Sequence, residues 1–101
     1  MSVDQQTIIS VWQKGKIIPG NNPNVFRQDS CGAWLRFSDY GNRQSKYGWE
    51  IDHITSGGPD YLSNLRPLHW RNNVEKSNGR LACAVASQGA ENIAVRYGRQ
   101  V

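Results

Sequence analysis

The chain has 101 residues, which is enough for one domain with a single small core and too few for two. Apolar residues make up 38% of the sequence and the mean hydropathy is −0.66, so we expect a polar, loop-rich globular domain of modest intrinsic stability. Twelve basic residues against eight acidic ones give a net charge of +4, which favours a polyanionic partner without establishing one.

The sequence shows no pattern of membrane insertion or secretion. No stretch approaches the ~18 apolar residues that a membrane span requires. Asp4–Thr7 stands where a signal peptide has its basic start, and the apolar run Ile8–Trp12 is too short for the core of such a peptide. We therefore expect a cytoplasmic protein.

The two cysteines, Cys31 and Cys83, are far apart and neither belongs to a CxxC pair. This spacing supports neither a four-thiolate zinc site nor a disulfide framework. A cytoplasmic location also argues against a bridge between them. We expect two reduced, packed thiols.

The first half of the chain predicts a helix followed by a β ribbon. Asp4 is the expected N-cap of a helix over about Gln5–Lys14, which Gly15 would end, although the β-branched residues make a strand the alternative. Residues 16–24 are rich in Pro, Gly and Asn and predict an exposed loop. Residues 25–37 predict a covering strand or ribbon, followed by a turn or single helical turn at 38–42.

The second half predicts strand, loop, strand and helix, and then a hairpin. The alternating segment near residues 50–54 ends in the loop Gly57–Asp60, and a short apolar return over 62–68 leads into a polar helix from about residue 71. Two β-prone runs, 81–85 and 92–97, predict a hairpin before a frayed end at 98–101. We assign one domain to residues 1–101, with an N-terminal helix and loop at 1–24, a motif core at 47–80, and a hairpin and tail at 81–101.

The motif core contains the groups that phosphodiester hydrolysis requires: a base for water, a cation for the developing charge, and donors for the substrate backbone. Asp52 offers a hard oxygen ligand for Mg²⁺ or Mn²⁺, and His53 can act as a neutral general base. Neighbouring strand residues point to opposite faces, so both can serve one site only at a bulge or at the end of the strand.

Two asparagines follow at spacings that suit the same site. Asn64 comes 64 − 53 = 11 residues after His53, and Asn73 comes 73 − 64 = 9 residues after Asn64. Two strands around a loop, followed by a helix, would bring Asp52 beside Asn73 at the helix start while Asn64 ties the loop back toward His53. Taken singly, Asn64 and Asn73 are ordinary turn and cap residues, so their roles depend on the set.

With these residues the segment resembles the HNH endonuclease family. The resemblance lies in Asp52-His53, Gly57-Gly58, Leu62-Ser63-Asn64-Leu65 and Asn72-Asn73-Val74-Glu75-Lys76-Ser77. Asn73 replaces the last histidine of the motif, which makes the chain an HNN variant, similar in this respect to the HNH domain of CRISPR effector nucleases. The resemblance implies an α+β fold built on a ββα-metal (His-Me finger) hairpin, here with an N-terminal helix and additional short strands.

The resemblance also implies a role for each residue. Asp52 and Asn73 would coordinate one divalent metal at the scissile phosphate, His53 would activate the attacking water, and Asn64 would orient the loop and the base. Histidine-rich members, such as the colicin nucleases, have a further ligand at the position of Ser77. Oxygen ligands at Asp52 and Asn73 favour Mg²⁺ or Mn²⁺ over Zn²⁺. The expected reaction is hydrolysis of a DNA phosphodiester, one strand nicked per event.

Several alternatives remain open from the sequence. The hairpin could belong to a non-catalytic nucleic-acid-binding module, or to a nuclease acting on RNA or structured junctions. The specificity is weak or comes from a homodimer or a partner protein. His69 is expected to be packed or to contact phosphate, not to bind metal. The tryptophans Trp34, Trp49 and Trp70 are assigned to packing. The cations that could contact phosphates, or simply be solvated, are Lys76, Arg66, Arg71 and Arg80.

Overall fold

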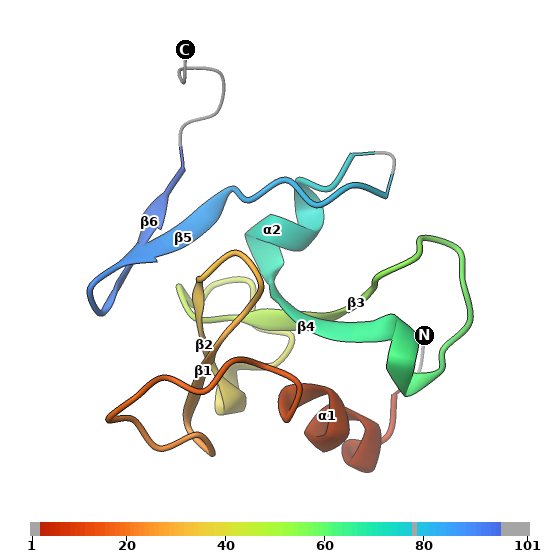
Figure 1. Cartoon of the computed structure of the whole chain (residues 1–101), viewed down its shortest axis with the longest axis horizontal. Helices are drawn as coiled ribbons and strands as arrows, with labels where there is room; N and C mark the ends of the chain where they lie inside the picture. The colour runs from red at the N-terminus through yellow and green to blue at the C-terminus, as the bar shows by residue number, and fades with distance from the viewer. Residues whose placement is uncertain (1–2, 78, 96–101) are drawn as a thin grey trace.

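Two antiparallel strands, β3 (Trp49–His53) and β4 (Leu65–His69), lie at the centre of the computed structural model, which describes residues 3–77 and 79–95. They pair without interruption from Trp49 opposite His69 to His53 opposite Leu65. Helix α1 (Gln5–Trp12) lies on one side of this pair and helix α2 (Trp70–Val74) on the other (Figure 1). The order strand, loop, strand, helix is as the sequence predicts.

The two faces of β3 differ in chemistry because successive side chains of a strand alternate. Trp49, fully buried, and Ile51 belong to the apolar cluster with α1. Glu50 and Asp52 instead contact side chains at and just after α2. The central strand therefore separates the core from a polar face.

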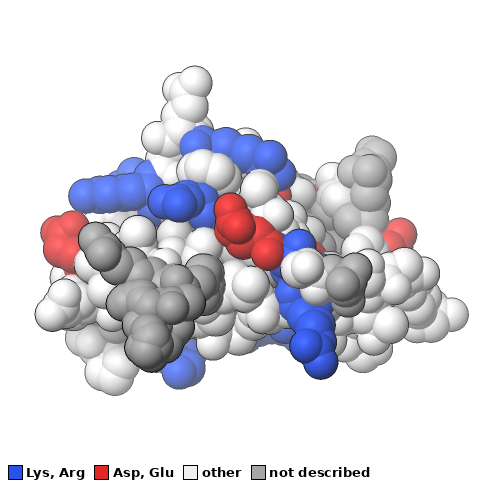
Figure 2. Space-filling view, turned by 90° about the horizontal axis from the view of Figure 1, so that it is seen from above, with Lys and Arg blue, Asp and Glu red and all other residues white. Residues whose placement is uncertain are grey.

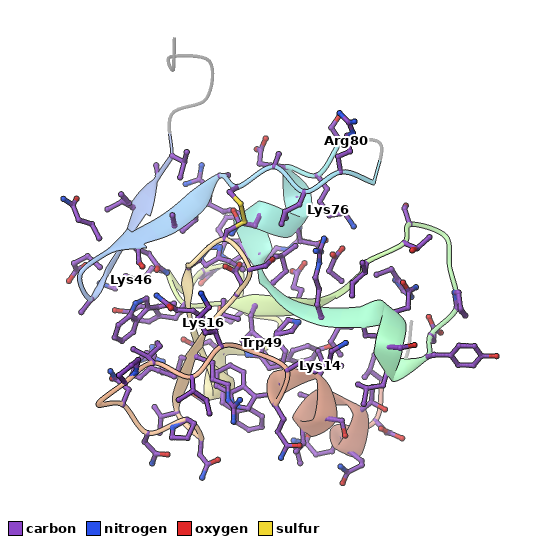
Figure 3. The ribbon with its side chains drawn as sticks, in the orientation of Figure 1. Lys14, Lys16, Lys46, Trp49, Lys76 and Arg80 are labelled. Carbon is purple, nitrogen blue, oxygen red and sulfur yellow. A yellow bond between two sulfur atoms is a disulfide. The ribbon has the colours of Figure 1, made fainter. Side chains whose placement is uncertain are left out.

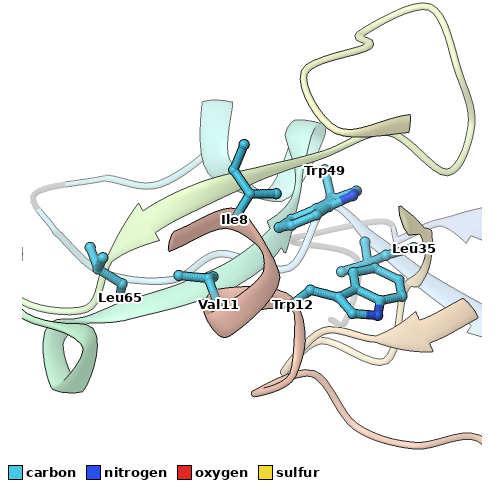
Figure 4. Close-up of a cluster of buried hydrophobic side chains, with 6 residues drawn as sticks. All are labelled: Ile8, Val11, Trp12, Leu35, Trp49 and Leu65. Atoms are coloured by element: carbon cyan, nitrogen blue, oxygen red, sulfur yellow. The ribbon is translucent and has the colours of Figure 1, made fainter. Parts of the chain in front are cut away.

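Helix α1 begins where the sequence predicts. The Asp4 carboxylate accepts a hydrogen bond from the Thr7 amide at 2.8 Å, which caps the first turn. The helix ends at Trp12, two residues before the predicted Lys14. Its buried residues pack against the central strands, and the members of the cluster drawn in Figure 4 are Ile8, Val11, Trp12, Leu35, Trp49 and Leu65.

The predicted ribbon is a hairpin of β1 (Phe26–Gln28) and β2 (Trp34–Arg36), followed by a single 3₁₀ turn at Phe37–Asp39. Asp29, in the turn of the ribbon, is only 2% exposed. One carboxylate oxygen accepts the amides of Cys31 and Ala33, and the other accepts the His69 amide and the Asn72 side chain. Because all four donors lie at 2.9–3.0 Å, this buried charge is satisfied and fastens the ribbon to the β4–α2 junction.

The predicted C-terminal hairpin is also present, with shifted bounds. Strands β5 (Val85–Gln88) and β6 (Glu91–Ala94) pair antiparallel around a two-residue turn, in which Gly89 has a φ of 61°. The turn is shorter than the gap between the predicted runs 81–85 and 92–97, because the pairing continues through Gln88 and Glu91. The expectation of a frayed end at 98–101 lies outside the described residues.

Three boundaries in the motif core differ from the prediction. Leu62–Asn64 is a 3₁₀ turn, so β4 starts at Leu65. Helix α2 begins at Trp70, because the His69 side chain accepts the Arg71 amide and serves as its N-cap. Asn73 therefore lies near the end of the helix and not at its start, and Lys76 follows the helix.

The expectation of two reduced thiols is wrong in this structure. Cys31 and Cys83 form a disulfide, with their Cα atoms 5.5 Å apart. The ribbon turn and the segment before β5 come together only in the fold, so the pairing of cysteines 52 positions apart could not be predicted from the sequence. In residues 3–77 and 79–95, no helix is long and apolar enough to cross a membrane.

Candidate functional site

Asp52 is a buried carboxylate held between two cations. Its side chain is 2% exposed. Arg66, directly opposite on β4, donates from Nε to Oδ2 at 2.7 Å. The Lys76 ammonium, which arrives from the segment after α2, contacts Oδ1 and also donates to the His53 carbonyl at 3.2 Å. Pairing on both oxygens is what allows a charged carboxylate to remain in this position.

His53 is the last residue of β3, and its side chain is 29% exposed. Its Nε2 lies 2.5 Å from Oδ1 of Asp60, in the loop that follows. A carboxylate on one ring nitrogen fixes the orientation of the ring. No local pattern singles out Asp60 in the sequence, since an exposed loop aspartate usually has no partner.

Asn64 connects both ends of the loop between β3 and β4. Its Oδ1 accepts the Thr55 amide at 2.8 Å, and its Nδ2 donates to the Pro59 carbonyl at 2.9 Å. A Cβ on Gly58 would lie 2.9 Å from Asn64 Nδ2 and 2.9 Å from the Thr55 carbonyl oxygen. The loop is therefore built around this amide.

Asn73 faces Glu50 and not Asp52. Its Nδ2 donates to Oε1 of Glu50 at 2.8 Å, and Arg43 holds the same carboxylate with bonds of 2.5 and 2.9 Å. Burial alone would raise the pKa of Glu50, but the hydrogen bonds from Arg43 and Asn73 outweigh it and lower the pKa. Glu50 is thus a charged neighbour of the site that the sequence reasoning missed, although its i−2 spacing from Asp52 predicts the same face.

The fold brings some of the predicted residues together and separates others. Asp52, the His53 backbone and Lys76 meet at the end of β3, whereas Asp52 and His53 direct their side chains to different partners. The strand pairing stays regular through His53, so there is no bulge between Asp52 and His53, and the two residues lie at the end of the strand. Ser77 lies in a turn closed by backbone hydrogen bonds with Arg80.

The oxygen atoms around Lys76 bear on whether a divalent cation fits at the end of β3. In the described part of the chain, no three His, Cys, Asp or Glu residues gather as a metal site. However, the Lys76 ammonium already contacts the Asp52 carboxylate and the His53 carbonyl, and it therefore marks a position where two oxygens hold a positive charge. Hard oxygen donors of this kind are the ones that Mg²⁺ or Mn²⁺ prefers, and in this structure the Lys76 ammonium stands between them.

His69 is buried and structural, one of the two roles expected for it. Nδ1 accepts the Arg71 amide at 3.1 Å, so the proton is on Nε2, which donates to the Lys46 carbonyl at 2.9 Å. Burial lowers the pKa of His69, and the nearby Arg71 adds to this effect. The ring is therefore neutral, and both of its nitrogens are hydrogen-bonded within the fold.

The remaining cations and tryptophans divide by exposure. Arg66 is mostly buried against Asp52, whereas Arg71 and Arg80 are exposed. Lys and Arg side chains are prominent on the face shown in Figure 2, where acidic side chains lie among them. Lys76 and Arg80 both lie near α2, with Lys46 on the opposite side of that helix (Figure 3). Trp49 is fully buried, as expected, and Trp34 and Trp70 are partly exposed.

Comparisons with protein-family models, curated proteins and solved structures found no match for this chain.

Proposed function

We propose that the protein is a metal-dependent endonuclease that hydrolyses DNA phosphodiester bonds, with the ββα-metal hairpin formed by β3, β4 and α2. The observation that carries the proposal is the end of β3. There a partly exposed histidine, His53, is hydrogen-bonded to the Asp60 carboxylate and directly follows Asp52, whose buried carboxylate is paired with two cations. A base and a cation site on consecutive residues suit the attack of water on a phosphodiester.

Three residues serve the attack of water in this proposal. His53 takes a proton from the attacking water at a ring nitrogen, and Asp60 stabilises the imidazolium that results. Asn64 keeps the loop that carries Asp60 in place through Thr55 and Pro59.

Asp52 and Asn73 are the proposed ligands of a single divalent cation, Mg²⁺ or Mn²⁺. When bound, such an ion supplies Lewis-acid stabilisation of charge on the phosphate and its leaving oxygen. For this to happen Lys76 must release Asp52, and Asn73 must present its amide oxygen while Nδ2 remains on Glu50. Lys76 is then available to the phosphate backbone, beside the exposed Arg71 and Arg80.

Relaxation of supercoiled plasmid tests the proposed function. The wild type, supplied with Mg²⁺ or Mn²⁺, is expected to convert supercoiled DNA to nicked circles, and a chelator is expected to stop the reaction. His53→Ala should reduce the rate about 10²–10⁴-fold, as is usual for loss of a general base, with an unchanged unfolding midpoint. Undiminished cleavage by the variant, or in the presence of chelator, would rule out this assignment.

A non-catalytic nucleic-acid-binding module is the second candidate. It is favoured by the same ion pairs, because Arg66 and Lys76 already neutralise Asp52 and Asn73 is turned to Glu50. Binding to DNA without metal-dependent relaxation would support this candidate. Cleavage of RNA or of branched junctions, with intact plasmid, would instead identify a nuclease with that substrate.

We also propose a cytoplasmic location. The Cys31–Cys83 bridge counts against this location, because the cytosol keeps most thiols reduced. Thiol titration of the denatured protein distinguishes reduced cysteines from a disulfide, provided that the protein is alkylated immediately after isolation from a reducing cytosol. Two free thiols would agree with the cytoplasmic location, and none would contradict it.

A further inference from the structure

A pocket of about 290 Å³ lies beside the candidate site, between the segment before β3 and the C-terminal hairpin. It is formed by residues far apart in the sequence, from the 43–46 segment, the β4–α2 junction, β5 and β6. The residues that line it and carry the argument are Arg43, Lys46, Trp70, Arg71 and Ile93.

The walls of this pocket are fixed by hydrogen bonds. The Trp70 indole donates to the Ser45 carbonyl at 3.1 Å, and Asn92 of β6 donates to the Lys46 carbonyl at 2.8 Å. Asn92 also exchanges two hydrogen bonds with the backbone of Trp34, at 2.7 and 3.0 Å. The hairpin is thereby tied to both the 43–46 segment and β2, so the pocket is preformed and needs little ordering on binding.

The lining combines apolar surface with positive charge. Trp70, Val85 and Ile93 supply apolar and aromatic surface, and none of the described lining residues is acidic. Arg43 is balanced by Glu50, and the contact between Lys46 and the exposed Glu91 is long, at 3.8 Å. The excess positive charge at the rim therefore comes from Lys46 and Arg71.

We infer that this pocket holds one unpaired nucleotide of a nucleic-acid strand, with the base against Trp70 and Ile93 and the phosphate at Lys46 and Arg71. The volume suits a single nucleotide and little more, and a flat ring with an adjacent negative charge matches this lining. The inference rests on the nucleic-acid partner of the proposed function and not on cleavage. It names a substrate with a single-stranded or extruded nucleotide.

Arg43 connects the pocket to the candidate site. It belongs to the lining, and it holds Glu50, which in turn accepts the Asn73 amide. A strand with one nucleotide in the pocket would therefore lie close to Glu50 and its partner Asn73. This continuity favours a nucleic acid over an acidic peptide as the occupant.

Fluorescence anisotropy with two labelled decamers tests the inference in the presence of chelator, so that cleavage plays no part. One decamer is oligothymidylate and the other has abasic sugars, with the same phosphates. The wild type is expected to bind the thymidylate about tenfold more tightly, the order expected for one stacked base. Ile93→Glu places a charge in the pocket at a side chain that is 39% exposed, and it should abolish this preference.

Ile17→Glu is the matched control, since Ile17 is 57% exposed and does not line the pocket. It should keep the tenfold preference. A second variant, Arg71→Gln, should weaken binding of both decamers equally, because it removes a phosphate contact and leaves the base contacts. An unchanged preference in Ile93→Glu, an equal loss in Ile17→Glu, or a wild type that binds both decamers alike would overturn the inference. Base preference without plasmid cleavage would contradict only the proposed function.

Discussion

At the scale of single residues, the state of Asp52 decides what the site can do. A carboxylate that is 2% exposed needs positive charge nearby, and here Arg66 and Lys76 provide it. Arg66 is fixed on the neighbouring strand. Lys76 follows the helix and reaches Asp52 with a long flexible side chain, so it is the cation that can be exchanged for a metal ion.

Removal of the Lys76 charge is therefore expected to strengthen metal binding. In Lys76→Met the competing ammonium is absent, and affinity for Mn²⁺, measured by isothermal titration calorimetry, should rise about tenfold, equivalent to ~1.4 kcal/mol. Lys46→Met, a matched change on the far side of α2, should leave the affinity as in the wild type (Figure 3). An equal or weaker affinity in Lys76→Met would show that Lys76 does not occupy the metal position.

His69 makes the stability of the fold depend on pH. Burial lowers the pKa of His69 below its usual 6.5, so the unfolded chain binds the proton more readily than the folded one. Its contribution to stability is complete above about 6.5 and is lost as the pH falls from there toward the lower folded pKa. Protonation also places a hydrogen on Nδ1, which must accept the Arg71 amide.

The free energy of unfolding in urea is thus expected to fall between pH 7.5 and pH 5.5. His69→Asn should flatten this dependence, since asparagine can cap α2 without titrating in this range. His53→Gln, which removes the other histidine, should keep it. A pH dependence that persists in His69→Asn and disappears in His53→Gln would show that it comes from His53 and would contradict this prediction.

At the scale of elements, the loop between β3 and β4 is shaped by Asn64. Gly58 leaves room for this side chain, because a Cβ there would meet both Asn64 Nδ2 and the Thr55 carbonyl at 2.9 Å. Gly58→Ala should therefore displace the amide and destabilise the protein by about 1–3 kcal/mol, the usual cost of overpacking. Hydrogen exchange at the Thr55 amide, which Asn64 accepts, should become faster.

Gly57→Ala is the informative comparison for this loop. Gly57 has a φ of 75° and no atom within 4 Å of the added Cβ, so the substitution strains the backbone without touching Asn64. It should cost stability while the Thr55 amide stays protected. If both variants accelerate exchange equally, Asn64 is not what orders the loop.

For the whole molecule, the Cys31–Cys83 disulfide joins the ribbon to the segment before β5. A cross-link across 52 residues restricts the unfolded chain, and Cys31→Ala/Cys83→Ala should lower the free energy of unfolding by about 2–4 kcal/mol. Dithiothreitol should produce a similar loss in the wild type and none in the double variant. Equal stability of oxidised and reduced wild type would contradict this contribution.

The local pattern of the chain was sufficient to predict most of its elements. Asp4 and the apolar residues after it predicted α1, alternation predicted β3 and the ribbon of β1 and β2, and two β-prone runs predicted the C-terminal hairpin. These signals succeed because capping and alternation depend on residues close in sequence. The α+β class and the order of β3, β4 and α2 follow from them, while the metal role of Asp52 and Asn73 and the base role of His53 remain predictions.

Only the tertiary structure decided which partners the polar side chains take. Lys76 on Asp52, Glu50 on Asn73 and the disulfide each join residues at least 23 positions apart, and no local spacing specifies them. The two carboxylate pairings arise from burial. Because the face of β3 that carries Glu50 and Asp52 is turned toward α2, each carboxylate needs a hydrogen-bond donor or a cation there. The sequence by itself thus determined the hairpin and its candidate residues, and packing determined how those residues are paired.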